Sequence, residues 1–415
     1  MHPKAFSRMS ELITQDRSSA APGALKLPQT YTIDWLASAE AFPAALWSCC
    51  FPPPLEGLWW YVALERAGLE DQFKFAYAQI SRDGEPVGIA PAFQMDLALE
   101  IVLPDQIAPV VAWIGRMVPA LRYQRTWFVG SPCSEHATIG LIPGVPLGDV
   151  LPELIKAVEA RAAQVNAHMI VWKDLTDGAS DDLLPYAKAA SLFKVPSFPG
   201  TEIHNLPASF DGYLASLPSS QRYHFKKKLK ASRTALDLKC NVIQSPDAAA
   251  MAEIWRLFQF TYDKATTRFE RLTPAFFYEL AKVPTTYFIM LRKSDGGQLV
   301  AFMLCYFENS CATNKFIGID YSLGNKTFLY FRLFEEFIIW ATSRGASSLS
   351  SGQTGYRAKT DLGHQLIPLN NFARNRNWLM NKISALVGRS ITWSTLDPDL
   401  KIYVEARARK GERRG

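Results

Sequence analysis

The spacing of apolar residues predicts helices and strands in mixed order along the first half of the chain. Leu58–Ala67 and Asp149–Val165 carry apolar residues at helical spacing. Phe73–Gln79 and Glu85–Gln94 are predicted to be paired strands, and Met169–Lys173 has the pattern of a short buried strand. Strands that pair locally and then alternate with helices favour a mixed α/β sheet.

A similar order of elements follows Val195–Gly200, a stretch with two prolines and a glycine that we predict to be a linker. Helices are expected over 209–217, 248–262, 274–281 and 328–343, and strands over 286–292, 299–308, 311–320 and 347–351. The likeness of the two halves indicates duplication of one αβ unit.

A length of 415 residues fits two domains. We expect a loose arm at 1–29, α/β domains at 30–195 and 209–395, and a basic tail at 396–415.

Composition indicates the cellular compartment of the protein and whether it spans a membrane. The six cysteines show no metal-binding spacing and are too sparse for a disulfide scaffold, so we expect a reduced, cytoplasmic protein without a metal site. The first residues lack the apolar stretch of a secretory signal. The longest apolar region, Leu97–Leu121, contains three charged residues and three prolines, which argues against a membrane-spanning helix.

The formal net charge of +6 is concentrated in two segments, Gln221–Arg233 and Lys401–Gly415. Each segment is either a solvated surface or a contact for phosphate or lipid headgroups.

Several enzyme classes lose their best evidence because their motifs are missing. The chain has no G-x-G-x-x-G, no G-x-x-x-x-G-K-[ST], no H-E-x-x-H and no G-x-S-x-G. These absences disfavour dinucleotide redox chemistry, nucleotide hydrolysis, zinc proteolysis and serine hydrolysis.

Two strand-end loops are candidate binding sites. The first joins a strand to the long helix at 318–328, where free N–H groups at the helix start would bind the phosphates of an acyl donor. The residues predicted to bind this donor are Gly318, Gly324, Asn325, Lys326 and Thr327. The alternative is an ordinary helix cap made by Asn325 or Thr327.

The second loop, Ser351–Lys359, follows a predicted strand and carries two glycines, an amide, a phenol and two cations. Open α/β sheets bind ligands at such strand ends. The alternative is a tight turn whose glycines only supply positive φ.

These loops carry a resemblance to GNAT-fold N-acyltransferases of the FemAB-like branch. The segment Gly352–Lys359 resembles that family most closely, and Phe210–Leu217 followed by Arg222–Lys228 is similar to the helix pair that opens its second domain. Val129–Ser134 is similar to a loop of bacterial members. The resemblance, which covers residues 30–390, implies two tandem GNAT-like domains in a FemAB-like arrangement. The chain lacks a clean [QR]-x-x-G-x-[GA] pyrophosphate signature, so the acyl carrier stays open.

The resemblance implies transfer of an acyl group from a thioester, or from an aminoacyl-tRNA, to a primary amine. Such chemistry needs a base for the ammonium proton, donors at the carbonyl oxygen and an acid for the leaving group. The candidate catalytic residues are Glu135, His136, His204 and Tyr356, and the candidate substrate-binding residues are Gln353, Lys359, Arg222 and Asp320. No tightly bound cofactor is expected; acyl-CoA or acyl-ACP would be a co-substrate.

Three substrate hypotheses remain, besides acylation of a soluble amine. The favoured one is acylation of a lipid amine such as a sphingoid base, as in bacterial ceramide synthases, by a protein that docks on the inner face of the membrane. The second is a FemAB-type transferase that uses aminoacyl-tRNA and a peptidoglycan precursor, and the third is a non-catalytic member of the fold. The favoured hypothesis depends on the aromatic content, on Leu97–Leu121 as an interfacial segment, and on the two basic segments.

Overall fold

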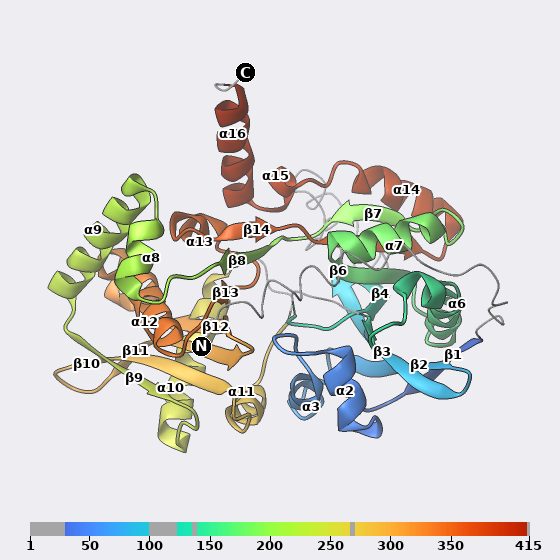
Figure 1. Cartoon of the computed structure of the whole chain (residues 1–415), viewed down its shortest axis with the longest axis horizontal. Helices are drawn as coiled ribbons and strands as arrows, with labels where there is room; N and C mark the ends of the chain where they lie inside the picture. Colours follow the sequence, from blue (N-terminus) through green and yellow to red (C-terminus); the bar gives the residue numbers. More distant parts are fainter. Residues whose placement is uncertain (1–29, 99–122, 135–138, 266–269, 413–415) are drawn as a thin grey trace, which may run out of the picture.

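The computed structural model describes residues 30–98, 123–134, 139–265 and 270–412. The chain forms two sheets, each covered by helices and lying side by side along the long axis of the molecule (Figure 1). We call the residues up to β7 (Phe193–Pro196) the N-terminal unit, and the residues from α8 (Phe210–Ser216) to β14 (Gln365–Ile367) the C-terminal unit.

The N-terminal unit contains a meander of strands followed by a strand–helix–strand crossover. Its elements are β1 (Tyr31–Leu36), η1 (Ala39–Ala41), α2 (Ala44–Cys50), α3 (Leu58–Glu65), β2 (Lys74–Arg82), β3 (Glu85–Ala98), β4 (Tyr123–Val129), β5 (Gly140–Leu141), α6 (Leu147–Gln164), β6 (Met169–Leu175), α7 (Asp177–Ala187) and β7 (Phe193–Pro196).

The C-terminal unit repeats this order after an added helix pair. It contains α8 (Phe210–Ser216), α9 (Ser219–Ala235), β9 (Leu238–Ile243), α10 (Ala248–Lys264), α11 (Pro274–Ala281), β10 (Thr286–Lys293), β11 (Leu299–Glu308), β12 (Cys311–Ile319), η3 (Tyr321–Leu323), η4 (Asn325–Thr327), α12 (Leu329–Ser343), β13 (Ser348–Ser350), α13 (Tyr356–Asp361) and β14 (Gln365–Ile367). Between the units lies β8 (Gly200–His204), and the chain ends with β15 (Asn370–Asn375), α14 (Trp378–Gly388), α15 (Trp393–Leu396) and α16 (Pro398–Glu412).

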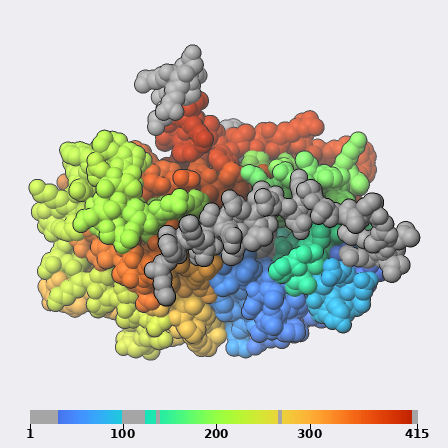
Figure 2. Space-filling model, in the orientation of Figure 1, coloured from blue at the N-terminus to red at the C-terminus, as the bar shows by residue number. Residues whose placement is uncertain are grey.

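The two units exchange one strand each. The first sheet has the order β1-β2-β3-β4-β6-β15-β7, and the second has the order β14-β8-β13-β12-β11-β10-β9. The strand that follows each unit in sequence therefore completes the sheet of the other unit. Figure 2 shows the orange-red C-terminal residues extending along the top of the molecule over both units.

This exchange alters the division that the sequence suggested. β15 lies within the predicted domain 209–395 but belongs to the N-terminal sheet, whereas β8 lies between the two predicted domains and belongs to the C-terminal sheet. The predicted linker Val195–Gly200 contains the end of β7 and the start of β8, and the predicted basic tail contains the whole of helix α16. Hydrogen bonding by distant strands is not visible in local apolar spacing, which explains these differences.

A shared apolar core joins the units. Trp60 of α3 packs edge-on against Phe276 of α11 with ring centroids 5.6 Å apart, and Trp59 packs against Tyr306 at 5.4 Å. One cluster of buried side chains includes residues of both units. Burial of this much apolar surface stabilises the two units as one body.

Candidate functional site

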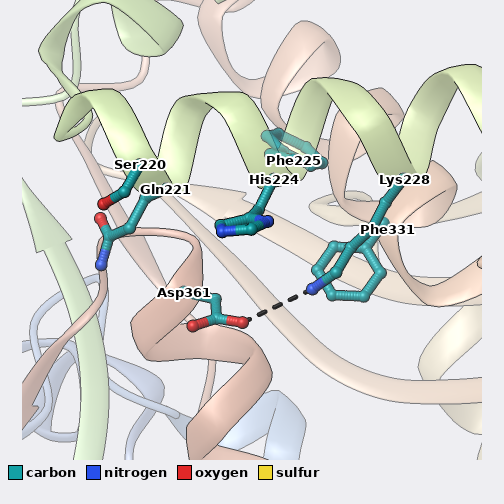
Figure 3. A pocket seen from close by; sticks show the side chains of 7 residues that line it. All are labelled: Ser220, Gln221, His224, Phe225, Lys228, Phe331 and Asp361. Carbon is teal, nitrogen blue, oxygen red and sulfur yellow. Dashed lines mark hydrogen bonds and ion pairs between the residues drawn. The ribbon is translucent and has the colours of Figure 1, made fainter.

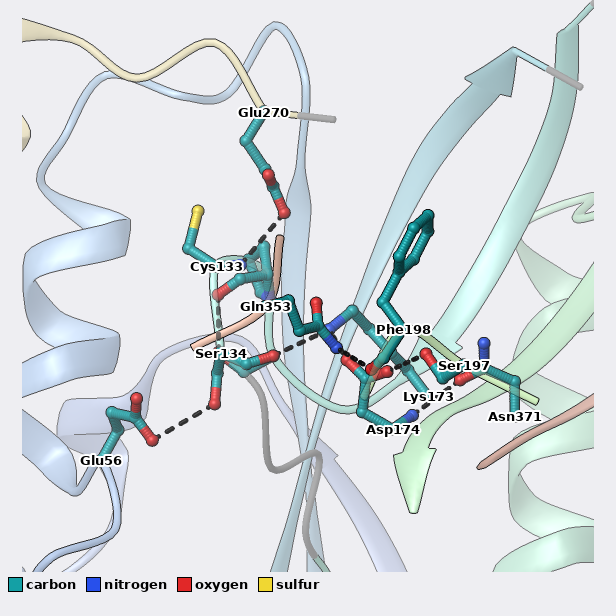
Figure 4. A network of polar contacts seen from close by, with 12 residues as sticks. Glu56, Cys133, Ser134, Lys173, Asp174, Ser197, Phe198, Glu270, Gln353 and Asn371 are labelled. Atoms are coloured by element: carbon teal, nitrogen blue, oxygen red, sulfur yellow. Dashed lines mark hydrogen bonds and ion pairs between the residues drawn. The ribbon is translucent and has the colours of Figure 1, made fainter. Parts of the chain in front are cut away.

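Polar side chains gather where the parallel strands β4 and β6 end and their chains diverge. The pairing of these strands runs from Thr126 opposite Met169 to Val129 opposite Trp172. Beyond it, the loop 130–134 and residues 173–175 separate, and side chains from both units fill the region between the sheets (Figure 4). We call this set the inter-unit network; its members are Glu56, Cys133, Ser134, Lys173, Asp174, Ser197, Glu270, Tyr306, Lys315, Gln353 and Asn371.

Lys173 and Asp174 tie the diverging chains together. The Lys173 ammonium group donates to the backbone carbonyl of Ser134 at 2.8 Å and pairs with the Asp174 carboxylate. Asp174 also accepts a hydrogen bond from Ser197, and its backbone N–H donates to Asn371 Oδ1 at 2.7 Å. The end of β6 is therefore fixed to the β7–β8 connection and to the exchanged strand β15.

Glu56 connects the two units through a buried ion pair. Its Oε1 accepts from Lys315 Nζ at 2.7 Å and from the Tyr306 hydroxyl at 2.9 Å, while its Oε2 accepts from Ser134 Oγ at 3.2 Å. The side chains of Lys315 and Glu56 are only 2% and 7% exposed. Lys315 lies at an irregularity of β12, where Leu304 pairs with Phe316 and Cys305 with Asn314. The extra residue redirects the Lys315 side chain toward the other unit, as bulges commonly do next to functional sites.

Glu270 contributes a carboxyl group suited to proton transfer. Its Oε1 accepts a hydrogen bond from the backbone N–H of Cys133 at 3.1 Å. Desolvation by burial raises the pKa of the Glu270 carboxyl above its ordinary value, although Lys173 and the Cys133 N–H act in the opposite direction. A carboxyl with a raised pKa is a better proton acceptor near neutral pH than an exposed one.

The predicted catalytic residues have contacts of different kinds, and two of them are not described. Glu135 and His136 lie outside the described residues, although Ser134, which precedes them, belongs to the network. His204 is half-exposed on β8, and its Nε2 lies 3.2 Å from Glu202 Oε2. Tyr356 is fully buried and donates to the backbone carbonyl of Pro199 at 3.1 Å.

The predicted substrate ligands of the second loop mainly shape that loop. Gln353 belongs to the network and donates to the Phe198 carbonyl at 2.8 Å. Lys359 is buried, and its ammonium group donates to the backbone carbonyls of Ser351, Gly352 and Gln353. These three hydrogen bonds hold the loop in place, and substrate binding by Lys359 stays a prediction.

The buried ring of His364 contacts two residues of the same loop. Its Nε2 lies 2.8 Å from Ser351 Oγ, and its Nδ1 lies 3.0 Å from the backbone carbonyl oxygen of Lys359. Burial and the nearby Lys359 charge lower the pKa of His364 to about 3. The ring is therefore neutral at physiological pH.

The predicted donor-binding junction has mixed roles. A Cβ at Gly318 would lie 2.3 Å from Phe302 Cε1 and 2.7 Å from backbone atoms of Leu257 and Phe258, so packing against α10 requires this glycine. Asp320 caps the short helix η3 by accepting from the Ser322 N–H at 3.1 Å.

Gly324 has a φ of +79° and open space around its Cα, and residues 325–327 form η4. The helix α12 starts only at Leu329, after a left-handed Phe328. The loop from Gly324 to Thr327 thus lies before the helix start, as expected, while Gly318 is a packing residue.

A pocket of about 190 Å³ lies between α9, α12 and α13 (Figure 3). Lys228 lies at its wall, 3.5 Å from Asp361 Oδ2 and 3.8 Å above the ring of Phe331. The other lining residues are Ser220, Gln221, His224 and Phe225. Arg222, a predicted substrate ligand on α9, instead donates to the Ala215 carbonyl at 3.1 Å and braces α8 against α9.

Neither a metal site nor a membrane span is found in the part of the chain that the structure describes. Within residues 30–98, 123–134, 139–265 and 270–412, no group of three or more His, Cys, Asp or Glu side chains could hold a metal ion. Among those same residues, no helix is long and apolar enough to cross a membrane.

Comparison with solved structures identifies the fold. FemX superposes with a TM-score of 0.54 at 11% identity, covering 84% of this chain and 99% of FemX. A conserved protein of unknown function from Bacteroides thetaiotaomicron VPI-5482 gives 0.51 at 13% identity, covering 82% of this chain and 99% of that protein. The fold is that of two tandem GNAT-like domains in a FemX-like arrangement.

Other comparisons gave weaker or partial matches. A tandem GNAT protein from the clavulanic acid biosynthesis pathway aligns with a TM-score of 0.47 at 10% identity, over 83% of this chain and 98% of that protein. Residues 203–367 match the FemAB-like family, described as peptidoglycan biosynthesis/recognition. The search of curated proteins gave no significant match. The matched family segment runs from the end of β8 to β14 and so covers the C-terminal unit of the fold.

Proposed function

We propose that the protein is an acyltransferase or aminoacyltransferase that forms an amide on a primary amine at the inter-unit network. The single observation that carries this proposal is Glu270, a carboxyl with a raised pKa held beside the diverging ends of β4 and β6. The match of residues 203–367 to a FemAB-like family supports a transferase in the same tandem fold.

The proposed reaction needs only proton transfer and charge stabilisation. Glu270 would take a proton from the ammonium form of the acceptor, and the freed nitrogen lone pair would form a C–N bond with the donor carbonyl carbon. The carbon–sulfur or carbon–oxygen bond of the donor then breaks, and Glu270 returns its proton to the leaving thiolate or alkoxide. The second proton that the nitrogen must lose passes from the new N–H₂⁺ group to Glu270 and then to solvent, which leaves the neutral amide. Lys173, whose charge already acts on Glu270, is the nearby cation for the developing negative charge.

The carrier of the acyl group would extend from the network toward α9 and the loop before α12. Gln353 of the network precedes α13, and Asp361 of the pocket is the last residue of α13, so this helix connects the two regions. Phosphate groups fit the positively charged face of α9 and the Gly324–Thr327 loop. Both a coenzyme A thioester and an aminoacyl-tRNA carry such phosphates.

For the acceptor, the family match favours a peptidoglycan precursor, with aminoacyl-tRNA as the donor. The second candidate is a lipid amine such as a sphingoid base, acylated from acyl-CoA or acyl carrier protein by a protein on the inner face of the membrane. Exposed apolar side chains on α14, including Trp378 and Leu386, favour this second candidate.

Mass spectrometry of products tests the proposal. The purified protein would be incubated with acyl-CoA, acyl carrier protein thioester or aminoacyl-tRNA, each with peptidoglycan precursors, sphingoid bases and soluble amines. We expect an amide product with one donor class, and the donor that reacts decides between the two candidates. Absence of amide product across the whole panel, from protein that is folded by circular dichroism, would refute the proposal.

A further inference from the structure

The helix α14 exposes an unusual amount of apolar surface. The relative exposures are 68% for Trp378, 51% for Leu379, 47% for Ile383 and 66% for Leu386. Figure 1 shows α14 along the outer edge of the N-terminal unit, beside β7. Large apolar side chains gathered on one short helix indicate an interaction surface and are uncommon on a surface that faces only water.

These side chains share one face of the helix. At roughly 100° per residue, Leu379, Ile383 and Leu386 fall within an arc of about 60°. Trp378 lies about 80° beyond Leu386 on the same side of the helix, with Lys382 between them. The C-terminal end of the helix packs on the sheet instead: a Cβ at Gly388 would lie 2.8 Å from Val195 Cγ1 and 3.2 Å from Phe193 Cδ2. The helix is therefore anchored to β7 while its apolar face points outward.

The charged residues of the segment that contains α14 are all positive. Residues 376–396 contain Arg376, Lys382 and Arg389 but no Asp or Glu. Lys382 Nζ lies 4.9 Å from the Trp378 ring, so an ammonium group adjoins the aromatic side chain. An indole and basic side chains at the rim of an apolar face are typical of helices that lie in the headgroup region of a bilayer.

We propose that α14 docks the protein on an anionic lipid bilayer, with its apolar face among the acyl chains and its cations at the headgroups. The absence of acidic residues from 376 to 396 favours a negatively charged surface over an uncharged one. The proposal does not depend on the proposed transferase activity, because it rests on exposure and charge alone. A second copy of this chain, or residues 99–122 of the same chain, would be the competing occupants of the face.

Vesicle co-sedimentation of the full chain tests the proposal. We expect binding to vesicles of phosphatidylcholine and phosphatidylglycerol in equal parts, with little binding to phosphatidylcholine alone and weaker binding at high salt. Leu379→Glu/Leu386→Glu should lower binding at least thirtyfold, roughly, because two apolar contacts are lost. Lys382→Gln/Arg389→Gln should lower it by a similar factor, about fivefold for each cation removed.

A matched control and two further measurements keep the outcomes distinct. Ile339 is 40% exposed on α12, in the other unit, so Ile339→Glu should bind vesicles like the unaltered protein. Each variant would also be measured by light scattering and thermal unfolding. Failure of the unaltered protein to bind anionic vesicles would overturn the proposal. So would a dimer that the α14 variants convert to monomer, or variants that unfold at lower temperature yet bind vesicles normally.

Discussion

The buried pair between Glu56 and Lys315 allows a sharp prediction about stability. Replacement of Glu56 by Ala would remove the Glu56 carboxylate from the Lys315 ammonium group, which is 2% exposed, and would remove acceptors from Tyr306 and Ser134. Loss of one partner of a buried ion pair typically costs about 3–5 kcal/mol, because the other charge stays buried. We therefore expect Glu56→Ala to lower the free energy of unfolding by about 3–5 kcal/mol.

Urea unfolding followed by tryptophan fluorescence measures this loss, and the chain offers a control. Asp71 and Arg271 also join the two units, but their side chains are 57% and 67% exposed. Exposed pairs contribute about 0–1 kcal/mol, so Asp71→Ala should cost less than about 1 kcal/mol. Equal effects of Glu56→Ala and Asp71→Ala would refute the reasoning, because burial would then not decide the strength of the contact.

Three further predictions concern single positions. Because the pKa of Glu270 is raised, the folded state prefers the protonated carboxyl, and the contribution of this group to stability is lost as pH rises. Glu270→Gln should therefore raise the melting temperature at pH 8, by the equivalent of roughly 1 kcal/mol. This gain should vanish toward pH 4. Because the pKa of His364 is lowered to about 3, the unaltered protein should lose stability as pH falls from 6.5 toward 3, by up to about 1.4 kcal/mol per pH unit. Urea titrations of His364→Gln should show a shallower loss of stability with falling pH. An identical slope for both proteins would contradict the lowered pKa of His364. Gly318→Ala should lower the free energy of unfolding by about 3 kcal/mol or more, because its Cβ would collide with Phe302 and α10. Gly324→Ala, in open space at φ +79°, should lower it by about 1 kcal/mol in the same assay. The reverse order would show that Gly318 is not a packing residue.

Local patterns in the sequence predicted most elements of the fold. The expected strand at 299–308 has the bounds of β11, and the expected helix at 328–343 differs from α12 by one residue. Apolar spacing sets these elements because each buries one face against a sheet or helix. The exchanged strands β8 and β15 are short and pair with the distant unit, so their spacing carries no sign of their partners.

The site was predicted only in part for the same reason. The sequence singled out Val129–Ser134 and Gln353, and residues of both contribute to the inter-unit network; substrate binding by Gln353 stays a prediction. Glu56, Lys173, Glu270 and Lys315 were missed, because each is one charged residue in an ordinary local setting. The Lys173–Asp174 pair at the end of a buried strand was a usable signal, whereas the approach of Glu56 to Lys315 depends on the packing of two units.

The rate of amide formation by Glu270→Gln tests the central claim most directly. The donor and acceptor found by product analysis would be used with unaltered protein, with Glu270→Gln, and with Glu336→Gln as the matched control. Burial also raises the pKa of Glu336, but that residue lies on α12, where its carboxyl contacts Cys240 and Arg332. The account predicts a loss of about 10²–10⁴-fold in kcat for Glu270→Gln and a change of less than about threefold for Glu336→Gln. Unchanged turnover in folded Glu270→Gln would contradict the assignment of amide formation to the inter-unit network.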